Sequence, residues 1–176
     1  MTKTRIAAAF LSLSAAAFVA RLSHEGYTDG AVIPTKGDVP TVGFGSTVRE
    51  DGTKVSMADR TDPVSALQRA LVHIERDGVQ IKQCIGPGVA LYQAEYDVYA
   101  ELAYNIGTQN FCVNKKTGGP AVIPRTLRAG DYRGACDAIL QYKFAAGYDC
   151  STPGNKRCGG VWKDRLRLHE KCVAAQ

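Results

Sequence analysis

The stretch of sequence that decides the fold is residues 24–47, which read HEGYTDGAVIPTKGDVPTVGFGST. Glycine, proline, threonine and valine are frequent in it, and residues 39–45 have the pattern of a short strand closed by glycines. Glu25 stands near its start, at the end of an apolar segment with helical character. The stretch therefore predicts a helix end that carries a carboxylate beside a small antiparallel sheet.

Helical patterns fill most of the chain after this stretch, beyond a polar, irregular segment at 49–61. Asp62 followed by Pro63 predicts a helix start, since aspartate is favoured as the N-cap and proline at the first helical position, and the helical period runs to about Gln83. The next helix, expected at 91–106, is apolar on most faces, which is typical of a central buried helix. Further helices are expected at 123–129, 132–142 and 161–173. The predicted fold is α+β, with a small N-terminal antiparallel β-sheet lobe and a larger helical C-terminal lobe.

Composition and charge narrow the class of protein. The chain has 176 residues, 45% of them hydrophobic and 22% charged, as in a soluble globular domain. Its net charge of +5 favours anionic partners such as the polymers of a bacterial wall. Basic residues are scattered, with no basic run and no zinc-finger spacing, so we expect no nucleic-acid partner.

Six cysteines occur, all after residue 83: Cys84, Cys112, Cys136, Cys150, Cys158 and Cys172. There is no Cys-x-x-Cys pair and there are three histidines, so no metal site is expected. An even count favours disulfides formed in an oxidising compartment over six reduced thiols. Of the possible pairings, Cys150 with Cys158 is favoured because a short turn separates them.

The N-terminus favours export. Lys3 and Arg5 precede residues 6–20, which carry no charge and are rich in alanine, as in a secretory signal of weak hydrophobicity. At ~1.5 Å per residue this run spans roughly 22 Å of a ~30 Å hydrocarbon core. We therefore expect residues 1–21 to form a signal-anchor-like helix that associates transiently with the inner membrane through residues 6–20, before a catalytic domain at 22–176. The alternative is a soluble alanine-rich helix packed on that domain.

Glu25, Asp38 and Thr41 are the candidate catalytic residues. Glycoside cleavage needs a carboxylic acid to protonate the leaving oxygen and a second polar or anionic group to position water or stabilise the transition state. Glu25 would need partial burial to hold its proton at neutral pH, whereas Asp38 should stay ionised in a wetter site. On these residues alone, a solvated surface pair remains an alternative.

The motifs occur in an order similar to that of the phage-type lysozymes, glycoside hydrolase family 24. They are His24-Glu25-Gly26-Tyr27, Pro40-Thr41-Val42-Gly43-Phe44-Gly45-Ser46-Thr47, Leu102-Ala103-Tyr104-Asn105-Ile106-Gly107, and Leu127-Arg128-Ala129-Gly130-Asp131-Tyr132. The resemblance covers residues 22–172 and implies a lysozyme-like fold. It also implies hydrolysis of the β-1,4 bond between N-acetylmuramic acid and N-acetylglucosamine of peptidoglycan during host cell lysis, by a monomer without a cofactor.

By this resemblance Glu25 is the acid, and Asp38 and Thr41 hold water or balance charge. The family places an Asp or Cys nine residues after the Glu and a Thr six after that. Here these counts reach Pro34 from Glu25 and Thr35 from Thr41, and neither is acidic. Asp38 is therefore the nearest candidate for the second carboxylate.

The N-terminal segment is similar to that of the signal-anchor-release endolysins within this family. The resemblance implies an enzyme that is first tethered, inactive, to the inner membrane and then released into the host periplasm. Release is expected to refold the segment onto the domain and to complete the active site around Glu25.

Three other functions are compatible with parts of the pattern. A lytic transglycosylase would use a single Glu and form an anhydro sugar. A cysteine hydrolase could use Cys172 with His169, one helical turn apart. A non-enzymatic wall-binding protein could keep a lysozyme-like fold without catalysis.

Overall fold

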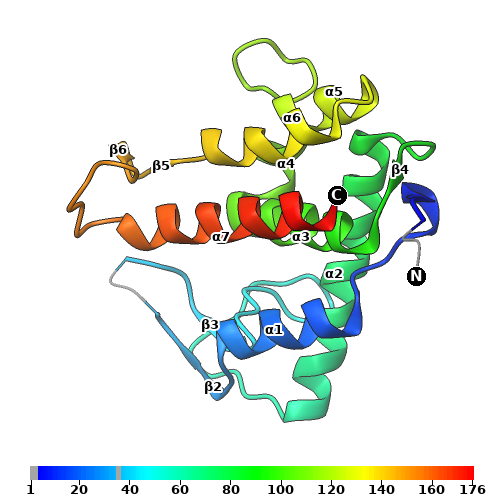
Figure 1. Cartoon of the computed structure of the whole chain (residues 1–176). Helices are drawn as coiled ribbons and strands as arrows, with labels where there is room; N and C mark the ends of the chain where they lie inside the picture. The colour runs from blue at the N-terminus through cyan, green and yellow to red at the C-terminus, as the bar shows by residue number, and fades with distance from the viewer. Residues whose placement is uncertain (1–3, 35–36) are drawn as a thin grey trace. The chain divides into compact units, whose positions relative to one another are not determined.

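The computed structural model describes residues 4–34 and 37–176 and has the expected α+β architecture (Figure 1). Its helices are α1 (Ala15–Glu25), α2 (Pro63–Ile85), α3 (Gln93–Ile106), α4 (Thr108–Cys112), α5 (Val122–Arg128), α6 (Tyr132–Asp137) and α7 (Gly159–Ala175), with 3-10 turns η1 (Ala8–Phe10) and η2 (Ala138–Gln141). Three antiparallel pairs are formed by β1 (Ile6–Ala7) with β4 (Ala90–Leu91), β2 (Thr28–Val32) with β3 (Thr41–Gly43), and β5 (Phe144–Ala145) with β6 (Tyr148–Asp149). Lys3 of the expected export signal and Thr35, six residues before Thr41, lie outside the described residues.

The chain forms two compact units. The sheet unit is residues 14–77, and the helical unit is residues 4–13 together with 78–176. Residues 4–13 pack with the helices, and the expected boundary at residue 21 falls within the sheet unit.

The sheet unit is built on β2, which has neighbours on both sides. Thr28 pairs with Gly43 of β3, and the Ala31 N–H donates to the Asp59 carbonyl oxygen (3.0 Å) on the other side. The predicted start of α2 is confirmed, since the Asp62 carboxylate accepts hydrogen bonds from the first turn of the helix. The unit therefore holds the end of α1, the short sheet and the start of α2 in one fold.

The helical unit has α3 at its centre, as the sequence predicts. Tyr96, Tyr99, Leu102 and Ala103 of this helix are buried in the core. The helix runs beside α7 (Figure 1). It begins at Gln93, two residues later than expected, because β4 takes the preceding residues into its pairing with β1.

The apolar run at 6–20 is divided between the units instead of forming one helix. Ile6–Ala7 are β1, Ala8–Phe10 are η1, and the rest contributes to α1. Ser14 sets the start of α1, because its hydroxyl accepts a hydrogen bond from the Ala17 N–H (3.1 Å) and caps the helix. Among the described residues, none of the helices combines the length and the apolar character needed to span a membrane.

All six cysteines form disulfides, and the favoured pairing of Cys150 with Cys158 is confirmed. The other bridges join Cys84 to Cys112 and Cys136 to Cys172. Cys172 is therefore not a free thiol in this structure, which removes the basis of the cysteine-hydrolase interpretation.

Two local elements differ from the expectation. The helix expected at 132–142 ends as α6 at Asp137 and continues as the tighter turn η2. The β5–β6 hairpin was not expected. Its turn places Ala146 and Gly147 at φ of 48° and 82°, the left-handed pair that a two-residue hairpin turn requires.

Candidate active site

Glu25 is the last residue of α1, and its carboxylate faces the backbone of Gly45. A Cβ atom placed on Gly45 would lie 3.0 Å from Glu25 Oε2. Gly45 also has a φ of +74°, which residues with a side chain rarely adopt. Glycine at this position therefore lets the turn after β3 come close to the carboxylate.

That turn is Gly43-Phe44-Gly45, and it is closed by two hydrogen bonds between the main chains of Val42 and Ser46 (3.0 Å each). Gly43 meets a different neighbour, because a Cβ there would lie 2.8 Å from the Cβ of Ala66 in α2. The two glycines of the motif thus allow two separate close approaches, one to α2 and one to Glu25.

The other two candidate residues lie upstream of the turn. Thr41 is half-buried at the start of β3, and its Oγ1 donates to the Val32 carbonyl oxygen (3.4 Å). Asp38 is exposed in the loop before β3, and its Oδ1 accepts from the Val39 N–H (2.8 Å). These contacts are local, and no hydrogen bond among the described residues joins Glu25 to either of them.

The expected partial burial of Glu25 is not found, since the residue is exposed. The cause is its position at the helix end, where the chain turns away through Gly26 at a φ of +71°. What the structure brings together is the end of α1 with the turn that follows Thr41. Sequence patterns missed this contact because twenty residues separate Glu25 from Gly45.

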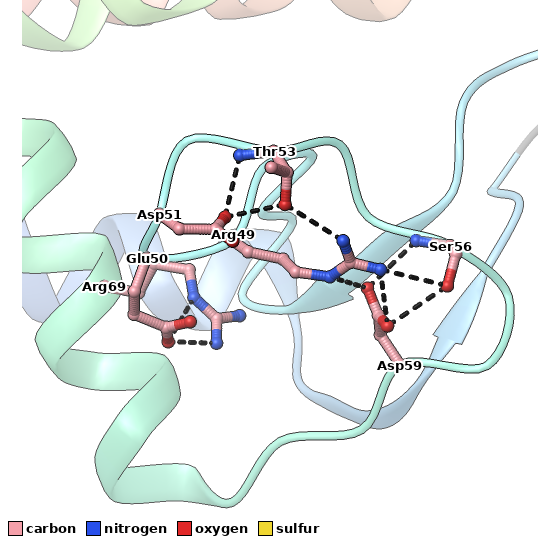
Figure 2. A network of polar contacts seen from close by, with 7 residues as sticks. All are labelled: Arg49, Glu50, Asp51, Thr53, Ser56, Asp59 and Arg69. Atoms are coloured by element: carbon pink, nitrogen blue, oxygen red, sulfur yellow. Dashed lines mark hydrogen bonds and ion pairs between the residues drawn. The ribbon is translucent and has the colours of Figure 1, made fainter.

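The segment after the turn is ordered by a set of polar contacts around Arg49, here called the Arg49 network (Figure 2). Arg49 donates two hydrogen bonds to the Asp59 carboxylate (2.7 and 2.9 Å) and one to Thr53 Oγ1 (2.9 Å). The Ser56 N–H also donates to Asp59 (2.9 Å). The hydrogen bonds from Arg49 and from Ser56 lower the pKa of Asp59 to about 2. The segment expected to be irregular is therefore a braced loop.

A second ion pair attaches this loop to α2. Glu50 accepts from Nε of Arg69 (2.9 Å) and from its Nη2, and the bond from Arg69 lowers the pKa of Glu50 (Figure 2). Arg69 is only 8% exposed, and its Nη1 is buried without a hydrogen-bond partner among the described residues. Burying a hydrogen-bond donor without a partner costs free energy. The ion pair with Glu50 therefore offsets part of the cost of burying the Arg69 guanidinium.

The helical unit contains a groove of about 830 Å³. Asn105 and Asn110 line it, and each donates a side-chain N–H to a main-chain oxygen of α3, Asn105 to Glu101 and Asn110 to Ile106. The charged residues in its lining are all basic: Lys115, Lys116 and Arg165. Within the described part of the chain, no three His, Cys, Asp or Glu side chains gather as metal ligands would.

The comparisons with known proteins agree with this fold. The phage lysozyme family model matches residues 22–158. The structure is similar to the endolysin from Escherichia coli O157:H7 phage FAHEc1, at 21% identity over 95% of this chain and 96% of that chain, with a TM-score of 0.71. A mutant of P22 lysozyme is 22% identical over 93% and 99% of the two chains (TM-score 0.69), and the active form of P1 phage endolysin Lyz is 15% identical over 92% and 85% (TM-score 0.63). A search of curated proteins gave no match.

Proposed function

The chain belongs to the phage lysozyme family, and from this premise we propose that it cleaves the β-1,4 bond between N-acetylmuramic acid and N-acetylglucosamine, with Glu25 as the general acid. Family membership makes the chain a lysozyme-type peptidoglycan hydrolase; the bond cleaved and the residues that cleave it are the proposal. The observation that carries it is the exposed Glu25 carboxylate at the end of α1, beside the turn at Gly45.

Glu25 donates its proton to the glycosidic oxygen as the bond breaks. The sugar then carries oxocarbenium-like positive charge, and a water molecule attacks it. Because Glu25 is exposed, the substrate can approach the acid from the solvent side. Hydrolysis at this acid needs neither metal nor organic cofactor.

Asp38 and Thr41 hold the attacking water in this mechanism. Thr41 uses its hydroxyl hydrogen on Val32, which leaves its oxygen lone pairs to accept a hydrogen bond from water. Asp38 uses Oδ1 on the Val39 N–H, so Oδ2 is the oxygen that takes the proton of the water. Inversion would require a carboxylate separation of about 6.5–9.5 Å in the substrate complex, and retention about 5–5.5 Å.

The substrate is a polar, anionic wall polymer, and the charge of the chain suits it. The net charge is +5, and the groove of the helical unit has only basic residues among its charged lining. Long-range attraction of this kind raises the rate of encounter and weakens as salt increases. Lys115 and Lys116 of this groove supply basic groups for anionic parts of the polymer.

The chain acts in the host periplasm as a monomer, after transient tethering through residues 6–20. The support is the apolar character of this run and its location in the folded chain. Ala8 and Leu11 are buried in the core of the helical unit, and α1, which ends at Glu25, starts at Ala15. A tethered chain cannot bury these residues in the core at the same time, so release and completion of the fold are coupled. Fractionation of expressing cells tests this, and an enzyme never found in the membrane fraction would refute it.

The test of the acid is Glu25→Gln, with Glu75→Gln as the matched control. Glu75 is an exposed glutamate of the same unit, on α2. We expect Glu25→Gln to lower the rate of release of reducing sugar from purified peptidoglycan by roughly 10²–10⁴-fold, the usual contribution of a general acid, and Glu75→Gln to leave it unchanged. Asp38→Asn and Thr41→Val are measured alongside and should lower kcat to a smaller extent.

Two results would contradict the proposal. Clearing of permeabilised Gram-negative cells by Glu25→Gln at the rate of the unmodified chain would exclude Glu25 as the acid. Mass spectrometry of the products separates hydrolysis, which leaves a reducing end, from transglycosylation, which leaves an anhydro end. Anhydro products would assign Asp38 and Thr41 structural roles instead.

A further inference from the structure

Tyr27 lies two residues after Glu25 and contacts two other parts of the sheet unit. Its ring packs against that of Phe44, with ring centroids 5.4 Å apart and planes inclined by 52°. Its hydroxyl donates a hydrogen bond to the Thr61 carbonyl oxygen (3.1 Å). Tyr27 is 38% exposed, and desolvation together with the carboxylates of Asp29 and Asp62 raises its pKa.

The contact with Phe44 acts on the turn that faces Glu25. Phe44 is the middle residue of Gly43-Phe44-Gly45, and it supplies the only side chain in those three positions. Gly45 is the residue whose backbone the Glu25 carboxylate approaches. Because the chain runs directly from Glu25 through Gly26 to Tyr27, the ring contact ties the end of α1 to the turn.

The hydrogen bond to Thr61 ties the same helix end to the start of α2. Thr61 immediately precedes Asp62, the N-cap of that helix, and its own N–H donates to the Asp29 carbonyl oxygen (2.9 Å). The turn also packs on this part of α2, through Gly43 against Ala66. Tyr27 therefore links three segments: the end of α1, the glycine turn and the start of α2.

We propose that Tyr27 is a positioning residue for the proton donor: through Phe44 and Thr61 it holds the Glu25 carboxylate at its working distance from the turn. The inference rests on the proposed function, since the position of Glu25 affects the rate only if Glu25 is the acid. Acid catalysis is sensitive to such placement, and a displacement of about 1 Å can cost roughly 100-fold in rate.

The experiment compares Tyr27→Ala with Tyr27→Phe in the full chain. Tyr27→Ala removes both contacts, and we expect kcat on peptidoglycan to fall roughly 30- to 100-fold while KM changes by less than about twofold. Tyr27→Phe keeps the ring against Phe44 and loses the hydrogen bond, so kcat should stay within about threefold of the unmodified chain.

Ile74→Val is the control for a loss of packing in the same unit. Ile74 is buried in α2, about three helical turns after the start of that helix. The substitution Ile74→Val should leave kcat of the folded enzyme unchanged. Circular dichroism checks that each variant is folded at the assay temperature. If Tyr27→Ala does not fold, Tyr27→Leu, which fills the space without an aromatic ring, takes its place.

A double variant tests whether the effect runs through the turn. Phe44→Ala alone should reproduce most of the loss, and Tyr27→Ala with Phe44→Ala should lose little more than Tyr27→Ala, because residues that act through one contact are not additive. If the two substitutions were independent packing defects, their fold losses in kcat would instead multiply in the double variant.

Three outcomes overturn the inference while leaving the proposed function intact, provided that Glu25→Gln is inactive. They are an unchanged kcat in Tyr27→Ala, a raised KM with unchanged kcat, which would mean direct contact with substrate, and multiplicative losses in the double variant. Activity of Glu25→Gln would instead refute the proposed function itself.

Discussion

Gly45 combines two constraints, of which Gly52 has only one. The φ of Gly45, +74°, is a left-handed conformation, and its missing side chain leaves room for Glu25 Oε2. Gly52 has the first constraint only, since its φ is +82° and no atom lies within 4 Å of the Cβ position. Substitutions at Gly45 and Gly52 can therefore separate the effect of backbone strain on stability from the effect of a side chain on the position of Glu25.

We expect Gly45→Ala and Gly52→Ala to destabilise the protein similarly, by about 1–2 kcal/mol, because a side chain is unfavourable in the left-handed region. Only Gly45→Ala should also lower kcat, by about tenfold or more, because its Cβ displaces the Glu25 carboxylate. Urea unfolding and initial rates on peptidoglycan measure the two effects. Equal kcat values for the two variants would show that Gly45 matters for the backbone alone.

The loop between β3 and α2 owes its order to side chains that have no periodic spacing. Arg49 bonds Asp59 ten residues later, and Ser56 adds a main-chain donor to the same carboxylate (Figure 2). Asp59 in turn belongs to the segment that pairs with β2, through its carbonyl oxygen and the Ala31 N–H. The Arg49 network therefore supports the sheet that carries Thr41.

The network should make stability depend on pH at the acidic end. The pKa of Asp59 is about 2 in the folded chain, below its value of about 3.9 in an unfolded one, because Arg49 and Ser56 bond its ionised form. Its contribution is therefore present above about pH 4 and is lost as the pH falls towards 2. Urea unfolding of Asp59→Asn should show less loss of stability than the unmodified chain between pH 5 and pH 2.

Asp149 offers an independent comparison in the helical unit. Hydrogen bonds from Lys143 and Ser151 lower its pKa to about 2 as well. Because the two sites share no partner, the effects of Asp59→Asn and Asp149→Asn should add. Parallel stability curves for Asp59→Asn and the unmodified chain would contradict the role assigned to Asp59.

At the scale of the whole molecule, the chain begins in the helical unit, forms the sheet unit and then returns. The N-terminal end of this path is held by Arg5, which donates two hydrogen bonds to Glu95 (3.3 and 3.1 Å). The guanidinium also lies 4.4 and 3.8 Å from the ring centroids of Tyr92 and Tyr132. Glu95 is fully buried, and its ion partner Arg5 comes from the N-terminal segment of the chain.

Arg5→Gln should destabilise the protein by about 3 kcal/mol, because it leaves a buried carboxylate without its ion partner. Hydrogen exchange should accelerate at the amides of Ala8 and Ala9, which bond main-chain oxygens next to β4. Glu95→Gln in the Arg5→Gln background should recover part of the loss.

Arg133→Gln is the matched control for Arg5→Gln. It breaks an exposed i,i+4 ion pair with Asp137 in the same unit and should cost at most about 0.5 kcal/mol. A loss from Arg5→Gln as small as that from Arg133→Gln would mean that the buried Glu95 does not depend on Arg5.

Short-range signals determined much of the fold. The Asp62-Pro63 helix start, the glycines after β3, the buried face of α3 and the Cys150–Cys158 bridge were all predicted, because each depends on residues within a few positions of one another. The helix end at Glu25 belongs to the same class. Capping, turn conformation and helical period are properties of a local stretch, so the sequence by itself was sufficient for them.

Only the tertiary structure decided which distant groups meet. The approach of Gly45 to Glu25 and the contacts of Tyr27 join segments about twenty or more residues apart, and the pair Arg5–Glu95 spans ninety. No periodicity encodes such partners, because they follow from which surfaces pack together once the elements have formed. The sequence alone therefore identified Glu25 as the candidate acid. Tertiary packing determined that the turn at Gly45, the ring of Tyr27 and the start of α2 lie around it.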